Sequence, residues 1–319
     1  MREALYYQDV IQTANVTAEH VFFAAGKELL AGYIYRPSDA AKQQAKYPAI
    51  IVGHPAGGVK EQTAGVYAVM LAEEGFLTLT FDARYQGESS GAPRYLEDPE
   101  TRVEDFRCAV DYLTTVADVD AERIGILGMC AAGGYVVRAA GTDVRMKAIA
   151  TVSMADLGDM FRTGLGRTMT QEMREGLLAQ VAAQRTAEAH GAPTKYIGYV
   201  PGTQEEAEKL PSDYYEGYDY YRVSSARHPR SVNKMIFSEI GRLVAFTALD
   251  RVNLLGKRPY LAVAGTKAGT KYFAEESTKA AENGDLCWIE GSTHIELYYV
   301  KDYVEQAVAR LTAFFHDSL

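Results

Sequence analysis

The stretch GILGMCAAGG, residues 125–134, joins an apolar run that predicts a strand directly to a pattern that predicts a helix, with Cys130 at the junction. A tight strand-to-helix turn needs small residues around the reactive side chain, and Gly128 meets that need; Ala132 stands where such turns usually carry glycine. The following helix N-terminus lowers the pKa of a thiol and favours its nucleophilic thiolate form. The alternative is a small buried cysteine that only packs against the sheet.

Similar apolar runs occur on both sides of this stretch and alternate with helical patterns. Residues 21–36 alternate apolar and polar side chains around a Gly-Lys turn, which predicts a β-hairpin. Continuous apolar strands separated by helices indicate a mostly parallel α/β sheet covered on both faces. Ligands of such sheets bind at the carboxyl ends of the strands. The predicted strands cover residues 48–55, 76–84, 123–130, 147–154, 258–265 and 285–291.

The alternation of strands and helices stops between residues 155 and 250. Helical patterns over 170–189 and 233–249 flank a loop rich in tyrosine there. We therefore predict a core formed by residues 1–154 and 251–319, with residues 155–250 inserted as a helical, tyrosine-rich cap. Tyrosine combines flat apolar area with a hydroxyl group, so these side chains either contact a partly apolar substrate or simply pack the cap onto the sheet. The candidate substrate-binding residues are Tyr85, Tyr214 and Tyr215.

Composition and charge narrow the range of partners. The 319 residues are 47% hydrophobic and carry 33 Lys plus Arg against 42 Asp plus Glu, a net charge of −9. An acidic chain argues against nucleic-acid and anionic-membrane surfaces, so we expect a small-molecule substrate, with a homodimer as a possible assembly. No segment has the apolar length of a secretion signal or a membrane span. Three cysteines are too few for a disulfide framework, which favours the cytoplasm.

Two further segments complete a candidate active site. The glycine-rich turn HPAGG, residues 54–58, follows a predicted strand and suits an oxyanion hole. Because proline has no N–H, Ala56 or Gly57 must donate there, and Ala131 supplies the second N–H. His294 follows the last predicted strand, where a general base for Cys130 belongs; the other five histidines lie in less suitable contexts.

Four motifs follow one another along the chain in an order that resembles that of the α/β-hydrolase superfamily. They are HPAGG, DARYQGESSG, GMCAAG and STH. The chain is most similar to its dienelactone-hydrolase-like branch, in which several members carry Cys as nucleophile, and to a bacterial subgroup of uncharacterised hydrolases. The resemblance covers nearly the whole chain. It implies an α/β-hydrolase fold and a cap inserted after the sixth strand of the family scheme.

One position departs from the family pattern. In the family pattern, the acid that orients the histidine follows the strand before the last one, and the last strand leads to the histidine. In this sequence the position of that acid is Gly269. Our first substitute is Asp156, because some α/β-hydrolases place the acid after an earlier strand; its alternative role is a helix cap. Weaker candidates are Asp250, Glu275 and Glu276.

These observations predict a hydrolase that acts on an ester, lactone or thioester, with Cys130, His294 and Asp156 as catalytic residues and Ala56 and Ala131 as oxyanion hole. The alternatives are an acyltransferase or cyclase with the same acyl-thioenzyme, and a non-catalytic binding protein, which Gly269 would explain. Arg84 and Glu88 either contact a polar substrate or hold a structural loop. No nucleotide loop, HExxH or CxxC motif occurs, so we expect no cofactor and no metal.

Overall fold

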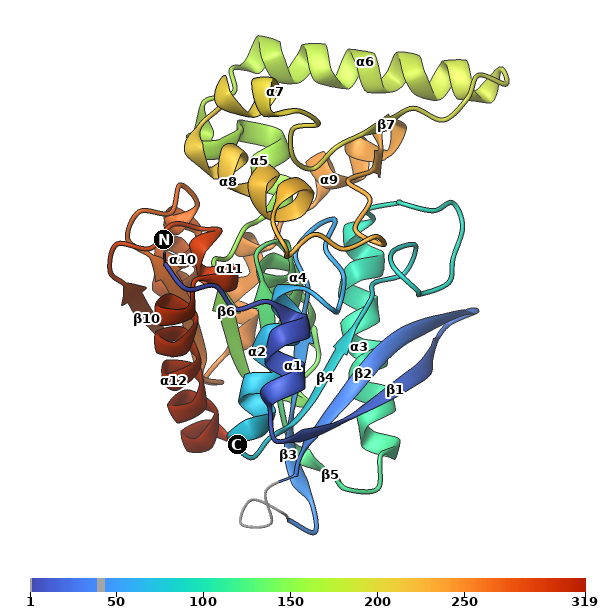
Figure 1. Cartoon of the computed structure of the whole chain (residues 1–319). Coiled ribbons are helices and arrows are strands. Elements are labelled where there is room, and N and C mark those ends of the chain that lie inside the picture. Colours follow the sequence, from blue (N-terminus) through green and yellow to red (C-terminus); the bar gives the residue numbers. More distant parts are fainter. Residues whose placement is uncertain (1, 39–43) are drawn as a thin grey trace.

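The computed structural model describes residues 2–38 and 44–319 and has an eight-stranded sheet at its centre (Figure 1). The strand order is β1-β2-β4-β3-β5-β6-β9-β10. The pairs β1–β2 and β2–β4 are antiparallel, and the other five pairs are parallel. This confirms the predicted mostly parallel sheet. Its strands are β1 (Val16–Ala25), β2 (Glu28–Pro37), β3 (Tyr47–Gly53), β4 (Leu77–Phe81), β5 (Val119–Met129), β6 (Met146–Val152), β9 (Tyr260–Gly265) and β10 (Gly284–Ile289).

The predicted hairpin forms and is longer than its sequence pattern indicated. β1 and β2 pair from Val16 opposite Pro37 to Ala25 opposite Glu28. The two-residue connection contains Gly26 at φ +66°, a left-handed conformation that glycine adopts without steric cost.

Helices cover both faces of the sheet because successive side chains of each buried strand point to opposite sides. In β3, Ala49 and Ile51 pack with one set of helices, whereas Ile50 and Val52 pack with the other. The first set is α3 (Pro99–Thr115), α4 (Ala131–Thr142) and α10 (Lys271–Ala280). The second set is α1 (Tyr7–Thr13), α2 (Thr63–Glu73) and α12 (Lys301–Ser318), with the short α11 (Glu296–Tyr299) just before α12.

Between β6 and β9 the chain forms mainly short helices, which lie over one end of the sheet (Figure 1). We call residues 155–250 the cap segment. Its helices are α5 (Leu157–Thr163), α6 (Gln171–Ala189), α7 (Gln204–Glu208), α8 (Ser212–Tyr218) and α9 (Ile240–Ala245), and its two strands are β7 (Tyr196–Ile197) and β8 (Met235–Ile236). Short 3₁₀ or π-helical turns occur at Leu165–Arg167, Asp219–Val223, Phe237–Glu239 and Leu249–Leu255.

Of the two helices predicted in this segment, one forms over its predicted length and the other forms only in part. α6 begins after Thr170, whose side chain accepts a hydrogen bond from the N–H of Met173. The helix predicted over residues 233–249 forms only in part, as α9 from Ile240 to Ala245. Met235 and Ile236 instead pair with β7 and are buried, so tertiary packing overrides the local helical pattern. No helix in the described part of the chain has the length and apolar character needed to cross a membrane.

Candidate active site

Cys130 occupies the sharp turn between β5 and α4. Its backbone has φ +53° and ψ −119°, an uncommon conformation for a residue with a Cβ. Three backbone hydrogen bonds hold it: the Cys130 N–H donates to Val152, and the Cys130 carbonyl accepts from Gly133 and Ala155, at 2.8–3.0 Å. A Cβ on Gly128 would lie 2.4 Å from the carbonyl oxygen of Ala132. The predicted strand-turn-helix context of Cys130 is therefore confirmed, together with the need for glycine two positions before it.

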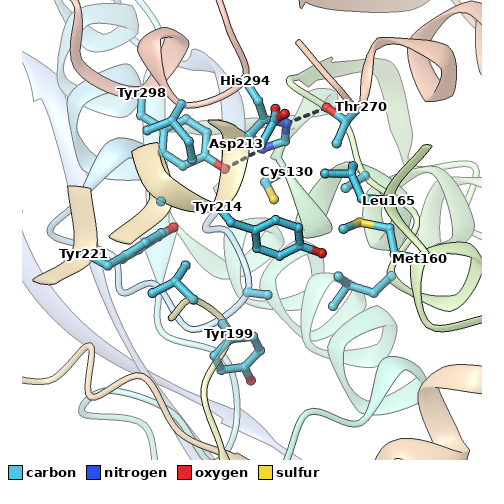
Figure 2. Close-up of a pocket in the computed structure, with 16 residues that line it drawn as sticks. Cys130, Met160, Leu165, Tyr199, Asp213, Tyr214, Tyr221, Thr270, His294 and Tyr298 are labelled. Carbon is cyan, nitrogen blue, oxygen red and sulfur yellow. Dashed lines mark hydrogen bonds between the residues drawn. The ribbon is translucent and has the colours of Figure 1, made fainter. Parts of the chain in front are cut away.

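His294 lies in the turn between β10 and α11 and is buried beside Cys130 (Figure 2). Its Nδ1 is 2.5 Å from the Thr270 hydroxyl, and its Nε2 is 2.9 Å from the Tyr298 hydroxyl. The Ser153 hydroxyl donates to the His294 carbonyl at 2.9 Å. Side chains on both ring nitrogens and a bond to the backbone thus hold the imidazole in one orientation.

The thiol and the imidazole shift each other's protonation. Burial raises the pKa of the Cys130 thiol, but the interactions with His294, Tyr298 and the Ala131 N–H outweigh it and lower the pKa. Burial lowers the pKa of His294, whereas Cys130 and the carboxylates of Asp213 and Glu216 raise it, and the net shift is upward. Both directions favour a thiolate-imidazolium pair.

We expect iodoacetamide at about pH 7.5 to alkylate Cys130 well before the other two cysteines, because only the thiolate reacts. The alkylation rate of Cys130 should rise with pH through its lowered pKa and level off below the range of an ordinary thiol. Burial raises the pKa of Cys108 to about 11 and also raises that of Cys287, so both stay protonated. Peptide mass spectrometry over a pH series measures this; equal labelling of all three cysteines at neutral pH would contradict it.

Of the two residues predicted to form the oxyanion hole, one follows Cys130 in the chain and the other lines the same pocket. Ala131 is the first residue of α4, and its N–H interacts with the Cys130 sulfur. Ala56 lines the same pocket as Cys130. Its turn is held by His54, whose Nε2 accepts from the Ala83 N–H at 3.0 Å while Nδ1 bonds to the Pro55 carbonyl at 2.7 Å. His54 is therefore a buried structural residue of this turn.

Asp156, the predicted substitute acid, does not reach the imidazole. Its side chain caps α5 by accepting from the Asp159 N–H at 3.1 Å, and its other oxygen accepts from the Ala248 N–H at 2.8 Å. Both ring nitrogens of His294 have other partners, Thr270 and Tyr298. The structure therefore gives Asp156 the capping role that was its alternative interpretation. The physical reason is that backbone N–H groups of the cap segment donate to both oxygens of this carboxylate.

Of the three tyrosines predicted to contact substrate, one lines the pocket. Tyr214 on α8 borders the cavity, whereas Tyr215 is 40% exposed and Tyr85 packs its ring next to Gly91 in another loop. Four residues that line the pocket are not indicated by the sequence patterns: Asp213, Thr270, Tyr221 and Tyr298. Only the spacing of Tyr298, four residues after His294, offered a local signal.

The pocket above Cys130 has a volume of about 120 Å³ and is mainly apolar (Figure 2). The cap segment contributes Met160, Leu165 and Val200, and the sheet side contributes Ile295 next to the histidine. The described residues that line it include no lysine or arginine, and the carboxylate among them is that of Asp213. In the described part of the chain, no group of three or more His, Cys, Asp or Glu side chains is arranged to hold a metal ion.

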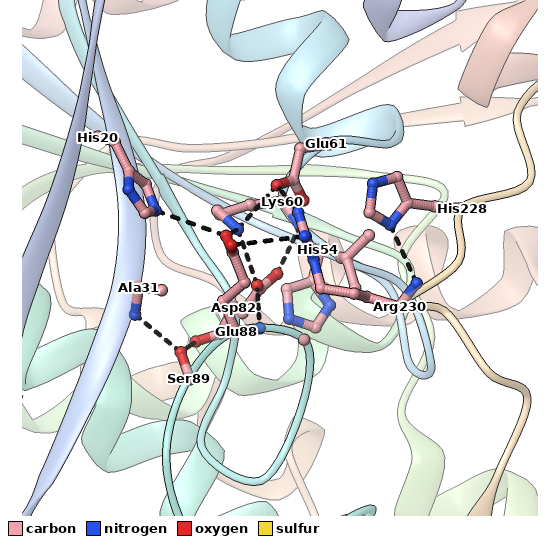
Figure 3. A network of polar contacts seen from close by, with 12 residues as sticks. His20, Ala31, His54, Lys60, Glu61, Asp82, Glu88, Ser89, His228 and Arg230 are labelled. Carbon is pink, nitrogen blue, oxygen red and sulfur yellow. Dashed lines mark hydrogen bonds and ion pairs between the residues drawn. The ribbon is translucent and has the colours of Figure 1, made fainter.

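A second cluster of polar side chains lies beside the glycine-rich turn rather than in this pocket (Figure 3). The buried Lys60 ammonium lies 2.9 Å from Asp82 and 2.8 Å from Glu61, and it also contacts Glu88. Arg84 forms a 2.6 Å ion pair with Asp105. Arg84 and Glu88 therefore belong to a structural loop, the second of the two interpretations left open for them.

Comparison with known proteins relates this geometry to a family. The model of the dienelactone hydrolase family matches residues 30–153. The chain is 35% identical to the uncharacterized protein YcjY of Escherichia coli K12 over 294 residues, which cover 91% of this chain and 94% of YcjY. The crystal structure of the hypothetical protein PA2218 from Pseudomonas aeruginosa has a TM-score of 0.89 at 32% identity, covering 96% of this chain and 95% of PA2218. The thiohydrolase aneE of Aspergillus aculeatus is 33% identical over 144 residues, 45% of this chain and 42% of aneE.

Proposed function

This chain belongs to the dienelactone hydrolase family of α/β-hydrolases, and we propose that it hydrolyses a thioester, ester or lactone with Cys130 as nucleophile and His294 as base. The observation that carries the proposal is the thiol at the β5–α4 turn facing a buried histidine whose ring is held at both nitrogens. The name of the relative aneE, a thiohydrolase, supports a thioester among the three substrate types.

The reaction follows from the positions of these groups. The Cys130 thiolate attacks the acyl carbonyl, and the N–H groups of Ala131 and Ala56 stabilise the oxyanion that forms. The tetrahedral intermediate collapses, the bond to the leaving group breaks, and the His294 imidazolium donates its proton to that group. His294 then takes a proton from water, which attacks the acyl-thioenzyme and releases the carboxylic acid and the Cys130 thiol.

Tyr298 has a supporting part in this reaction. Its hydroxyl bonds to His294 Nε2, and it interacts with Cys130 as well. Burial and the nearby Cys130 raise the pKa of Tyr298 well above its ordinary value, so the phenol stays protonated. A neutral hydroxyl in this place stabilises the thiolate by hydrogen bonding without adding charge to the pocket.

The experiment that tests the proposal is an assay of the purified protein with phenyl thiobutyrate and 4-nitrophenyl butyrate, with intact and peptide mass spectrometry of quenched samples. We expect continuous release of thiophenol or nitrophenol and a transient butyryl group on the Cys130 peptide. A stable butyryl adduct without turnover would overturn hydrolysis in favour of transfer to another acceptor. Neither turnover nor adduct with either substrate, despite rapid alkylation of Cys130, would contradict the proposal for simple acyl groups.

The charge of the pocket predicts a preference among acyl groups. We expect kcat/KM for a pentanoyl thioester to exceed that for a hemisuccinyl thioester of similar length by at least about tenfold. A carboxylate on the acyl chain would lose its hydration in a pocket lined by Met160 and Leu165, with no lysine or arginine among the described lining residues and Asp213 close by. Steady-state kinetics with the two thioesters measures the ratio, and a preference for hemisuccinyl would show that a cation reaches the pocket.

A further inference from the structure

The resemblance to α/β-hydrolases puts the acid of the triad at the position of Gly269, and in this structure a carboxylate from another part of the chain lies beside that glycine. A Cβ placed on Gly269 would lie 2.5 Å from Oδ2 of Asp213. Oδ1 of the same carboxylate accepts a hydrogen bond of 3.1 Å from the Gly269 N–H. Asp213 is near the start of α8 in the cap segment, 56 residues before Gly269. Because no side chain projects from position 269, the carboxylate can approach the backbone there.

The same helix brings its charges to the turn that holds His294. Asp213 and His294 both line the pocket, and Figure 2 shows the carboxylate next to the imidazole. One turn along α8, Glu216 accepts a hydrogen bond of 2.6 Å from the hydroxyl of Thr293, the neighbour of His294. Thr270, which follows Gly269, bonds to Nδ1 of the imidazole. α8 is thus attached on both sides of the histidine, through Gly269 and through Thr293.

The titratable groups around His294 face the ring from two sides. Cys130 and Tyr298 face the ring from the thiol side, while Asp213 and Glu216 face it from α8. Glu216 is engaged by Thr293, and its pKa is raised because burial outweighs that hydrogen bond. Asp213, with the Gly269 N–H as its hydrogen-bond donor, is therefore the better source of a fixed negative charge for the imidazolium.

We propose that Asp213 is the positioning residue of this site: from the cap segment it supplies the negative charge that stabilises the protonated His294, in place of an acid at position 269. The inference rests on the proposed function only for the role of His294 as base. It follows that the Cys130 thiol is fully converted to its nucleophilic thiolate only when α8 packs against Gly269. Closure of the cap segment and activation of the nucleophile are therefore coupled.

The first test is Asp213→Asn, which keeps the shape and a hydrogen-bond acceptor for Gly269 but removes the charge. Without that charge the imidazolium is less stable, so the pH midpoint of Cys130 alkylation by iodoacetamide should move upward, and kcat for a butyryl thioester should fall by about tenfold to a hundredfold. Asp219→Asn is the matched control, because Asp219 ends the same helix and does not line the pocket. An alkylation midpoint that moves no more in Asp213→Asn than in the control would overturn the proposal.

The second test moves the acid back to the family position. In the double variant with Asp213→Gly and Gly269→Asp, the space that Asp213 vacates receives the new carboxylate, and the backbone of Gly269 lacks the positive φ that would strain an aspartate. We expect the alkylation midpoint to return toward that of the unmodified protein. If Asp213 only anchored α8, Asp213→Asn would raise KM or lower Tm and leave the midpoint in place, which would contradict the proposal.

Alkylation requires no ester or thioester turnover, so the two proposals fail separately. A shifted midpoint in Asp213→Asn with no hydrolysis by the unmodified protein would support the role of Asp213 and contradict the proposed function. Hydrolysis by the unmodified protein together with an unshifted midpoint in Asp213→Asn would support the proposed function and contradict the role of Asp213. Circular dichroism of each variant checks that the chain is folded before its alkylation profile is compared.

Discussion

Replacing Cys130 by alanine is expected to lower kcat/KM for a butyryl thioester by at least about 10³-fold, because no covalent acyl intermediate can then form. Both residues carry a Cβ, so the φ of +53° is no more strained in the variant, and the Cys130 side chain is small. The loss should therefore appear in catalysis without a comparable loss of stability. Steady-state kinetics together with a thermal denaturation curve measures both quantities.

Cys108→Ala is the matched control for that variant. Cys108 is buried on α3 and burial raises the pKa of its thiol to about 11, so it has no part in the proposed chemistry. We expect its kcat/KM to stay within about threefold of that of the unmodified protein. If Cys130→Ala kept activity within tenfold, the nucleophile would have to be another group of the pocket.

The largest expected change in stability is that of Lys60→Met, which we expect to lower the free energy of unfolding by about 3–5 kcal/mol. The Lys60 side chain is fully buried, and its ammonium forms ion pairs with three carboxylates, of which that of Asp82 is fully buried too (Figure 3). Burial already raises the pKa of Asp82 against the effect of Lys60. Without the lysine, Asp82 remains as an uncompensated buried charge, whereas Glu61 and Glu88 still have Arg230 as a partner.

Urea denaturation followed by circular dichroism measures this change, and two further variants control it. Lys209→Met removes an exposed lysine paired with Glu205 one helical turn away and should cost no more than about 0.5 kcal/mol. Adding Asp82→Asn to Lys60→Met should restore part of the lost stability, since the pair is coupled. Equal losses for Lys60→Met and Lys209→Met would mean that the cluster does not stabilise the fold.

This cluster also connects stability to the candidate site. Lys60 follows the glycine-rich turn, and its own N–H donates to Asp82 at 2.8 Å. Ala83, the residue after Asp82, donates its N–H to His54 in that turn. Loss of the Lys60 ammonium should therefore loosen the turn that carries Ala56, and a fall in kcat is expected alongside the fall in stability.

The local parts of this protein could be predicted from its sequence. The hairpin, the order of strands and helices, the turn at Cys130 and the position of His294 after the last strand all follow from apolar periodicity and from glycine at particular positions. These features depend on residues close together in the chain, or on the rule that carboxyl ends of parallel strands meet at one edge of a sheet.

The partners of the histidine were decided only by the tertiary structure. Asp156 had the right place in the order of strands, yet two N–H groups of the cap segment engage it. Asp213 and Gly269 are 56 residues apart and have no common periodicity, so only the way α8 packs over the sheet brings the carboxylate to the glycine. Sequence patterns report which face of an element is apolar, but the seating of one element on another depends on side-chain shape and burial across the whole core.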